Sequence, residues 1–255
     1  VEEAPASCLN PEQRQKLLQT ALELARLFHY ENIGTVEFIV DREGQFYFSE
    51  IKPRIQIEHP LTEMVTRIDL VQEQFRLAAG QALSRTQEQV QVQGWSLQAR
   101  VTAGNPAENY LPDAGKLLHV RLPNGPEVRV DTYIYAGCEI PTRYDPLLGK
   151  LVVWGPSREA SLNRMQRAIE EFQIVGPQTN LPVLQTIFQD PAYVRGDLHD
   201  GLPVDRSLGD SSQENRLRDL AGAAALLYVR QTRTFQPVVP PRLMSGWHQD
   251  SRKLF

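Results

Sequence analysis

The first part of the chain shows one helical pattern followed by two strand patterns. Asn10 and Pro11 are typical of a helix start, because asparagine caps free N–H groups and proline at the first helical position loses no hydrogen bond. Apolar residues then recur at helical spacing. They predict an apolar stripe made of Leu17, Leu18, Ala21, Leu24, Ala25 and Phe28.

Two runs with strand composition come next, Thr35 to Val40 and Gln45 to Ile51. The turn-forming residues 41–44 join them, so we predict a β-hairpin. A second helix is expected from about Asp69 to Ala79, and Gly80 is well placed as its C-cap.

The pattern changes after residue 80. Residues 81–93 are polar, and their Gln–Val alternation predicts an exposed strand. From Trp95 to Val153, short β-like runs are separated by proline and glycine. The fold class is therefore α+β, with further helices expected from Ser157, over Leu181 to Phe188, and over Asn215 to Arg230.

Composition narrows the function classes. The formal net charge of -4 argues against nucleic acid or an anionic membrane as the main partner. The two cysteines, Cys8 and Cys138, are far apart in the sequence, and their spacing matches neither a metal-binding motif nor a disulfide framework. This favours a reducing, cytoplasmic compartment. No apolar run approaches the roughly 20 residues that span a bilayer. The chain begins at Val1 without a methionine, so we expect a piece of a longer polypeptide.

The predicted hairpin carries two acidic residues that could share an ion. If Val40 pairs with Gln45, Glu37 lies opposite Phe48, and Glu50 is diagonal to Glu37 on the same face. Two carboxylates this close repel one another, and a hard divalent cation such as Mg²⁺ would relieve the repulsion. The alternative is a solvated face with two unrelated glutamates, and spacing does not separate the two interpretations.

Beyond the hairpin, polar residues continue at every second position. A strand with this period has one polar and one apolar face. We interpret the polar face as an anion-handling strip with metal ligands, oxyanion donors and a base, although a solvated edge strand remains the alternative. The strip consists of Glu50, Lys52, Arg54, Gln56 and Glu58.

The order of motifs closely resembles biotin carboxylase, a part of acetyl-CoA, propionyl-CoA, methylcrotonyl-CoA and pyruvate carboxylases. The resemblance runs through roughly residues 1–205. It implies the C-terminal half of an ATP-grasp fold (1–84), a mainly β biotin carboxylase C-terminal domain (85–205), and a helical linker with the possible start of a biotin-transfer-type domain (206–255). The segments that carry it are Gly34–Phe38, Phe46–Glu50, Pro53–Glu63, Ala78–Gly80, Tyr144–Leu151 and Thr179–Asn180.

The resemblance implies roles for the residues of the strip. Glu37 and Glu50 match metal ligands that hold Mg²⁺ (or Mn²⁺) and the ATP phosphates. Arg54, Gln56 and the backbone at Ile57 match a bicarbonate cradle.

Two further residues match catalytic roles in that family. Glu58 matches the base that deprotonates bicarbonate for attack on the γ-phosphate of ATP, which gives carboxyphosphate. Arg100 matches the arginine that stabilises the enolate-like ureido group of biotin, the group that is then carboxylated. A solvent-exposed strand arginine is the alternative interpretation of Arg100.

The chain departs from the family at Lys52, where an asparagine is usual. A protonated ammonium offers no lone pair to a metal and could itself neutralise Glu37 and Glu50. Near Arg100, Gln98 and Ala99 replace a usual Glu-Cys pair. The glycine-rich lid that covers the ATP phosphates in the family has no counterpart here, so we expect this chain alone to be inactive.

The resemblance implies partners as well. We expect biotin on a carrier domain elsewhere, a carboxyltransferase component, the missing N-terminal half of the module, and a homo-oligomer. A cytoplasmic location is expected, or the mitochondrial matrix in a eukaryote. The alternatives are a diverged non-catalytic scaffold domain and another ATP-grasp ligase, such as a urea carboxylase, pyruvate carboxylase or carbamoyl-phosphate synthase relative.

Overall fold

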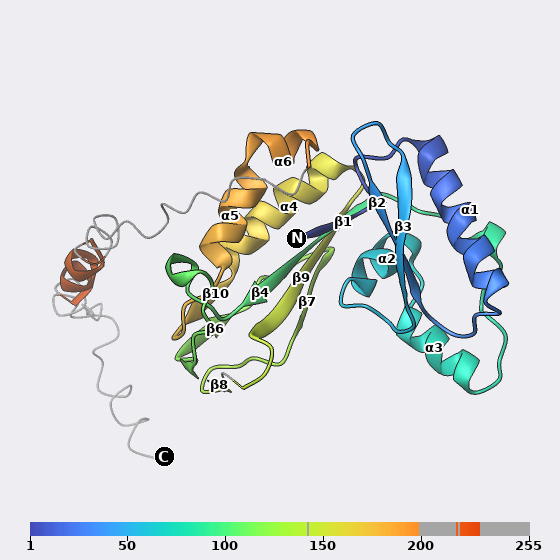
Figure 1. Cartoon of the computed structure of the whole chain (residues 1–255). Coiled ribbons are helices and arrows are strands. Elements are labelled where there is room, and N and C mark those ends of the chain that lie inside the picture. Colours follow the sequence, from blue (N-terminus) through green and yellow to red (C-terminus); the bar gives the residue numbers. More distant parts are fainter. Residues whose placement is uncertain (142, 199–217, 219, 230–255) are drawn as a thin grey trace, which may run out of the picture. The chain divides into compact units, whose positions relative to one another are not determined.

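The computed structural model describes residues 1–141, 143–198, 218 and 220–229 (Figure 1). The first helix, α1 (Pro11–Leu27), begins where the sequence predicts. The Asn10 side chain accepts a hydrogen bond from the Gln13 backbone N–H at 2.8 Å, and the Gln13 side chain accepts one from the Asn10 N–H at 3.0 Å. This reciprocal capping satisfies two N–H groups that have no partner inside the helix.

The predicted hairpin is confirmed as β2 (Thr35–Val40) and β3 (Phe46–Lys52). The predicted register is wrong. Asp41 rather than Val40 closes the loop onto Gln45, and Gly44 lies in the left-handed region at φ 80°. A bulge between Glu37 and Phe38 shifts the register again. Glu37 therefore lies directly opposite Glu50, not diagonal to it.

The strip does not continue as one strand face. Strand β3 ends at Lys52, and Pro53 follows, which has no N–H to donate to a strand partner. Residues 53–58 bend and turn, and a helix that the sequence did not predict, α2 (His59–Thr66), begins directly afterwards. The interpretation of positions 50–58 as one polar strand face is therefore wrong.

Helix α3 (Leu70–Ala78) confirms the second predicted helix, with the Asp69 side chain as its N-cap. The exposed strand expected within residues 81–93 is wrong, because the segment holds only a short 3-10 turn, η1 (Gln87–Gln89). The glutamine side chains bury little apolar surface, so alternation alone does not hold this segment in a sheet.

A four-stranded antiparallel sheet forms the second region, in the order β1-β4-β9-β7. Its long central strands are β4 (Trp95–Thr102) and β9 (Leu147–Gly155), and β7 (Val128–Thr132) forms one edge. Strand β1 (Glu2–Ala4) pairs with β4, so the first residues of the chain belong to this sheet. Two small strand pairs accompany it: β5 (Gly115–Lys116) with β8 (Glu139–Ile140), and β6 (His119–Arg121) with β10 (Gln173–Val175).

The hydrophobic core lies between this sheet and its helices. Helix α4 (Arg158–Glu171), capped by Ser157, packs against β9 and β4. Helices α5 (Leu181–Gln189) and α6 (Pro191–Arg195) complete the layer, and the short η2 (Pro106–Glu108) lies in a loop after β4. The predicted helices at Ser157 and Leu181 are confirmed. Fully buried core side chains include Leu97, Val101, Leu148, Leu151, Met165 and Phe188.

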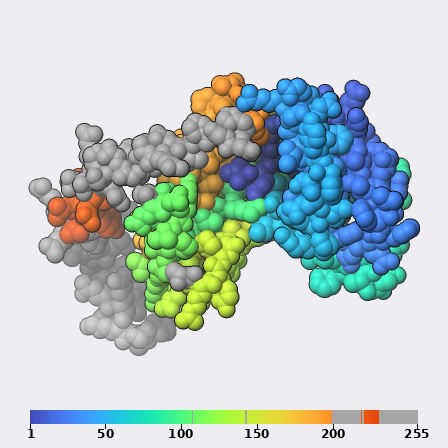
Figure 2. Space-filling model, in the orientation of Figure 1, coloured from blue at the N-terminus to red at the C-terminus, as the bar shows by residue number. Residues whose placement is uncertain are grey.

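The region of α1 and the hairpin is more open. Helix α1 has no buried residue. Four residues of its predicted apolar stripe line a cavity of about 700 Å³ shared with β2, α2 and α3, namely Leu17, Leu18, Ala21 and Ala25, whereas Phe28 follows the helix and is exposed. Tyr47 and Phe48 of the hairpin are more than half exposed. Figure 2 shows α1 and the hairpin as blue surfaces.

Residues 220–229 are helical, as expected for the middle of the predicted helix over residues 215–230. The ends of that prediction, and most of the predicted linker over 206–255, lie outside the described residues. Within the described part of the chain, the helices are too short or too polar to cross a membrane.

Candidate active site

Two glutamates meet across the hairpin because of its bulge. Glu37 and Glu50 are directly paired, so their side chains are close neighbours. The ammonium of Lys52 lies 2.5 Å from Oε1 of Glu37 and 3.3 Å from Oε1 of Glu50. The Gln56 amide donates a second hydrogen bond, of 2.9 Å, to Oε1 of Glu37. We call these four residues the hairpin cluster.

The protonation of the hairpin cluster follows from these contacts. The pKa of Glu37 is lowered, first by the hydrogen bond from Lys52 and then by the hydrogen bond from Gln56. The pKa of Lys52 is raised, chiefly by the same hydrogen bond to Glu37. Both shifts favour the charged forms, so Glu37 and Lys52 form a carboxylate–ammonium pair at neutral pH.

A second group of side chains forms around Arg100 of β4. Nη2 of Arg100 contacts Oε1 of Glu58, and the same nitrogen lies 2.7 Å from Oε1 of Glu2. The amide of Gln98, which precedes Arg100 by two residues on β4, donates to Oε2 of Glu2 at 3.2 Å. Nε of Arg100 is buried and has no hydrogen-bond partner among the described residues. We call Glu2, Glu58, Gln98 and Arg100 the Arg100 cluster.

Asn180 holds the backbone on which Arg100 stands. Its side-chain amide donates to the carbonyl of Arg100 at 2.9 Å, and its side-chain oxygen accepts from the N–H of Thr102 at 2.9 Å. One side chain therefore satisfies a backbone acceptor and a backbone donor on the same strand. This contact fixes the strand carrying Arg100 against the start of α5.

The loop over residues 53–58 connects the two clusters but leaves one predicted residue apart. Arg54 donates to the neighbouring carbonyl of Ile55 at 3.1 Å, and among the described residues it makes no hydrogen bond or ion pair with either cluster. The carbonyl of Ile57 accepts a long hydrogen bond from Lys150 of β9 at 3.5 Å. Glu58 and Gln56 both line the cavity beside α1, and Glu58 remains about one-third exposed.

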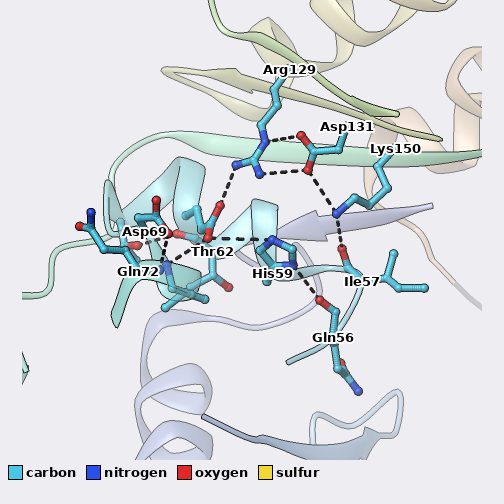
Figure 3. A network of polar contacts seen from close by, with 12 residues as sticks. Gln56, Ile57, His59, Thr62, Asp69, Gln72, Arg129, Asp131 and Lys150 are labelled. Carbon is cyan, nitrogen blue, oxygen red and sulfur yellow. Dashed lines mark hydrogen bonds and ion pairs between the residues drawn. The ribbon is translucent and has the colours of Figure 1, made fainter. Parts of the chain in front are cut away.

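A charged network holds the loop and α2 against the second region (Figure 3). Arg129 of β7 binds Asp131 through two hydrogen bonds, of 2.7 Å and 2.9 Å, and reaches Oε2 of Glu63 on α2 at 2.7 Å. Asp131 also lies 3.2 Å from the ammonium of Lys150. Where the loop joins α2, Nδ1 of His59 lies 2.8 Å from the carbonyl oxygen of Gln56.

Asp131 lies between two cations of this network, Arg129 and Lys150. Burial by itself would raise its pKa, but the hydrogen bonds and charges of Arg129, followed by those of Lys150, outweigh burial and lower the pKa. The pKa of Arg129 is raised in turn, first by its hydrogen bond to Asp131. Both residues are therefore charged in the folded protein at neutral pH.

Sequence reasoning missed this network and the role of Glu2. Arg129 and Asp131 alternate along a predicted β-rich stretch, and period two places them on one strand face. This alternation could therefore have predicted that Arg129 and Asp131 lie side by side. Their partner Glu63 and the acidic partner Glu2 of Arg100 come from distant segments, and no local pattern indicates such contacts.

Comparison with known proteins decides the relationship. Residues 98–202 match the family described as "Biotin carboxylase C-terminal domain", and residues 1–86 match "Carbamoyl-phosphate synthase L chain, ATP binding domain". The chain is a homologue of the biotin carboxylases. The expected α+β fold, with part of an ATP-grasp fold followed by the biotin carboxylase C-terminal domain, is thereby confirmed.

Individual biotin carboxylase relatives agree with this assignment. The biotin carboxylase of Nostoc sp. is 43% identical over 198 residues, covering 78% of this chain and 44% of that protein. The mitochondrial propionyl-CoA carboxylase alpha chain of Caenorhabditis elegans is 44% identical over 200 residues, covering 78% of this chain and 28% of that protein. The chain thus spans less than half the length of these curated relatives.

A solved structure shows the same fold. The biotin carboxylase domain dimer of the 2-oxoglutarate carboxylase from Hydrogenobacter thermophilus, solved with MgADP, ADP and bicarbonate, is 37% identical. Its TM-score is 0.77, and the match covers 78% of this chain and 44% of that chain.

In this biotin carboxylase homologue, the carboxylates expected to bind metal do not fit a divalent cation as they are arranged. The ammonium of Lys52 lies within hydrogen-bond distance of both Glu37 and Glu50, so a second cation bound between them would be repelled by this positive charge. Oε1 of Glu37 already accepts two hydrogen bonds. Among the described residues, no group of three or more His, Cys, Asp or Glu side chains is arranged to hold a metal ion.

Proposed function

We propose that this chain supplies the bicarbonate-handling part of a biotin carboxylase, which carboxylates carrier-bound biotin with ATP and bicarbonate through carboxyphosphate. The contact between Glu58 and Arg100 carries the proposal. These two residues come from separate segments and match the base and the biotin-facing arginine of the family. Their meeting brings a proton acceptor and a fixed positive charge to one place.

The Arg100 cluster has features of a site that receives a ligand. Glu58 and Arg100 are about one-third exposed, and an ion pair with this exposure contributes little to stability. The guanidinium of Arg100 carries five N–H donors, and its exposed part can donate to a ligand oxygen. Stability alone therefore does not account for this arrangement, whereas ligand binding does.

Two of the proposed steps can be assigned to residues of this chain. Glu58 takes the proton of bicarbonate, and the resulting oxyanion attacks the γ-phosphate of ATP to give carboxyphosphate and ADP. Carboxyphosphate breaks down to CO₂ and phosphate, the released phosphate takes the proton of N1′ of biotin, and N1′ then bonds to the carbon of CO₂. Arg100 stabilises the negative charge that develops on the ureido oxygen. No step depends on a metal held by the hairpin cluster.

The proposed bicarbonate cradle consists of Arg54, Gln56 and the backbone at Ile57. In this structure Gln56 donates to Glu37, and Arg54 donates to a neighbouring carbonyl. Both side chains keep donors that a planar oxyanion would attract. We propose that bound bicarbonate draws the side chain of Arg54 toward Gln56, and that Ile57 contributes its backbone.

The carboxyl acceptor and the partners extend the proposal. The relatives include the propionyl-CoA carboxylase alpha chain of Caenorhabditis elegans, described as mitochondrial, and the multifunctional pyruvate carboxylase of Rhizobium etli. We propose that a biotin carrier domain, a carboxyltransferase component and the remaining part of the biotin carboxylase module complete the reaction. By analogy with the dimeric relative we propose a homo-oligomer.

The test uses the intact protein that contains this chain. Phosphate release from ATP is measured with bicarbonate and free biotin, and compared with a Glu58→Gln variant. The variant should lose about 100-fold or more of the bicarbonate-dependent rate, because it lacks the general base. An intact protein that releases no bicarbonate-dependent phosphate contradicts the proposal.

Lys52 favours a second candidate function, a scaffold domain that keeps the carboxylase shape without its chemistry. The ammonium occupies the region where the family is expected to bind metal. The same phosphate assay separates the two candidates. A scaffold gives no turnover in the native protein, and turnover that appears only in a Lys52→Asn variant identifies Lys52 as the cause.

A further inference from the structure

The position of Lys52 in the hairpin is fixed by its backbone as well as by its side chain. Lys52 of β3 pairs with Thr35 of β2. Two residues away on each strand, Glu50 of β3 pairs with Glu37 of β2. Because side chains alternate along a strand, Lys52 and Glu50 leave the same face of β3. The lysine can therefore reach both carboxylates without any change in the hairpin.

The hydrogen bonds within the hairpin cluster leave little capacity for another cation. Oε1 of Glu37 accepts from the ammonium of Lys52 and from the amide of Gln56. Oε1 of Glu50 lies 3.3 Å from the same ammonium. Mg²⁺ requires oxygen ligands at about 2.0–2.1 Å in a nearly octahedral arrangement. A divalent cation that bridges these two oxygens on the side of Lys52 would have to displace the ammonium.

We infer that Lys52 is a built-in cation that takes the place of a divalent metal between Glu37 and Glu50. This inference rests on the proposed function, because only there would the two glutamates be metal ligands. The glutamate pair then binds no divalent cation, and the hairpin presents an ammonium to a bound phosphate. An ammonium acts as a mobile point charge with three donors, whereas a metal imposes a coordination geometry.

Titration with Mn²⁺ alone tests the inference, since its electron paramagnetic resonance signal falls when the ion binds. The full chain and its Lys52→Asn variant are titrated in parallel. The native chain should show no site that depends on Glu37. The variant should gain such a site, with affinity roughly 30-fold or more above the native chain, because one positive charge next to a divalent ion is removed.

Matched variants separate a local effect from a change in total charge. Lys116→Asn removes the same charge from an exposed lysine on β5 and should gain no site. Adding Glu37→Gln to Lys52→Asn should abolish the new site. Circular dichroism confirms that each variant is folded.

Three results would overturn the inference: Glu37-dependent binding in the native chain, no gain in the folded Lys52→Asn variant, or a gain that survives Glu37→Gln. None of these measurements requires turnover. A protein without bicarbonate-dependent phosphate release would contradict the proposed function while leaving the Mn²⁺ result in place. The two hypotheses can therefore fail separately.

Discussion

Arg129 on β7 lies 2.7 Å from Glu63 on α2, and this ion pair joins the sheet to the helix that follows the loop over residues 53–58. The Glu63 side chain is only 10% exposed, and its other oxygen accepts from the backbone N–H of Leu70 at 3.0 Å. Arg129 also holds Asp131 through two hydrogen bonds. The arginine therefore links α2 to the β7 edge of the sheet.

Replacing Arg129 should destabilise the fold. Arg129→Gln removes a charged partner from two acids and leaves Glu63 largely buried with one oxygen unpaired, which should lower the free energy of unfolding by about 1–3 kcal/mol. Urea denaturation followed by circular dichroism measures the change. Arg121→Gln, at an exposed arginine of β6, should stay within about 0.5 kcal/mol of the native chain. Equal midpoints for the two variants would contradict a structural role for Arg129.

Asn180 should matter through the backbone of the strand that carries Arg100. Asn180→Ala removes a donor to the Arg100 carbonyl and an acceptor for the Thr102 N–H, and should lower the free energy of unfolding by about 1–3 kcal/mol. Asn180→Asp keeps the acceptor but places a carboxylate oxygen against the Arg100 carbonyl, so it should also lower the stability. Thermal or urea unfolding ranks the three proteins. A variant of either kind that is as stable as the native chain would contradict this account.

The lowered pKa of Asp131 predicts a specific loss of stability in acid. A group whose pKa is lower in the folded protein binds fewer protons there than in the unfolded chain, so stability falls as the pH falls through that range. The contribution of Asp131 should be complete above about pH 4, near its ordinary pKa, and should be lost at lower pH. Urea midpoints of the native chain and of Asp131→Asn, measured from pH 7 to pH 3, should converge on acidification. A constant difference across this range would assign the effect to packing instead.

Glu2 and Glu58 both contact Arg100, but they should differ in activity. Glu2 pairs with Arg100 from β1 and acts as a positioning residue, so Glu2→Gln should lower the bicarbonate-dependent rate of the intact protein by no more than about 5-fold. Glu58→Gln removes the proposed base and should cost about 100-fold or more. The pH–rate profile separates them, because only the loss of a base should remove the acid limb. Equal losses in both variants would contradict the assignment of Glu58 as the base.

Local patterns predicted most helices and the hairpin. Asn10, Asp69 and Ser157 are capping residues, and the structure confirms a helix directly after each of them. Capping depends on groups within three or four residues, so the signal is contained in a short segment. The exposed strand expected before residue 94 failed because strand formation depends on a partner strand as well as on alternation.

The candidate site was predicted as a set of residues but not as an arrangement. The predicted register assumed that Val40 closes the hairpin loop, whereas Gly44 adopts the left-handed conformation and Asp41 closes it. A bulge then shifts the pairing again, and it brings Glu37 opposite Glu50. Bulges arise from packing and hydrogen bonding of the whole strand pair, which alternation does not encode.

The sequence by itself determined the resemblance to biotin carboxylases, the order of most secondary structure, and the residue types available for metal, oxyanion and base. These depend on local spacing and on motif order. Only the tertiary structure decided which of those residues meet: Lys52 lies between Glu37 and Glu50, and Glu58 reaches Arg100 on a strand far along the chain. Contacts between distant segments depend on how sheets and helices pack, because a few ångströms decide whether two charges share a hydrogen bond.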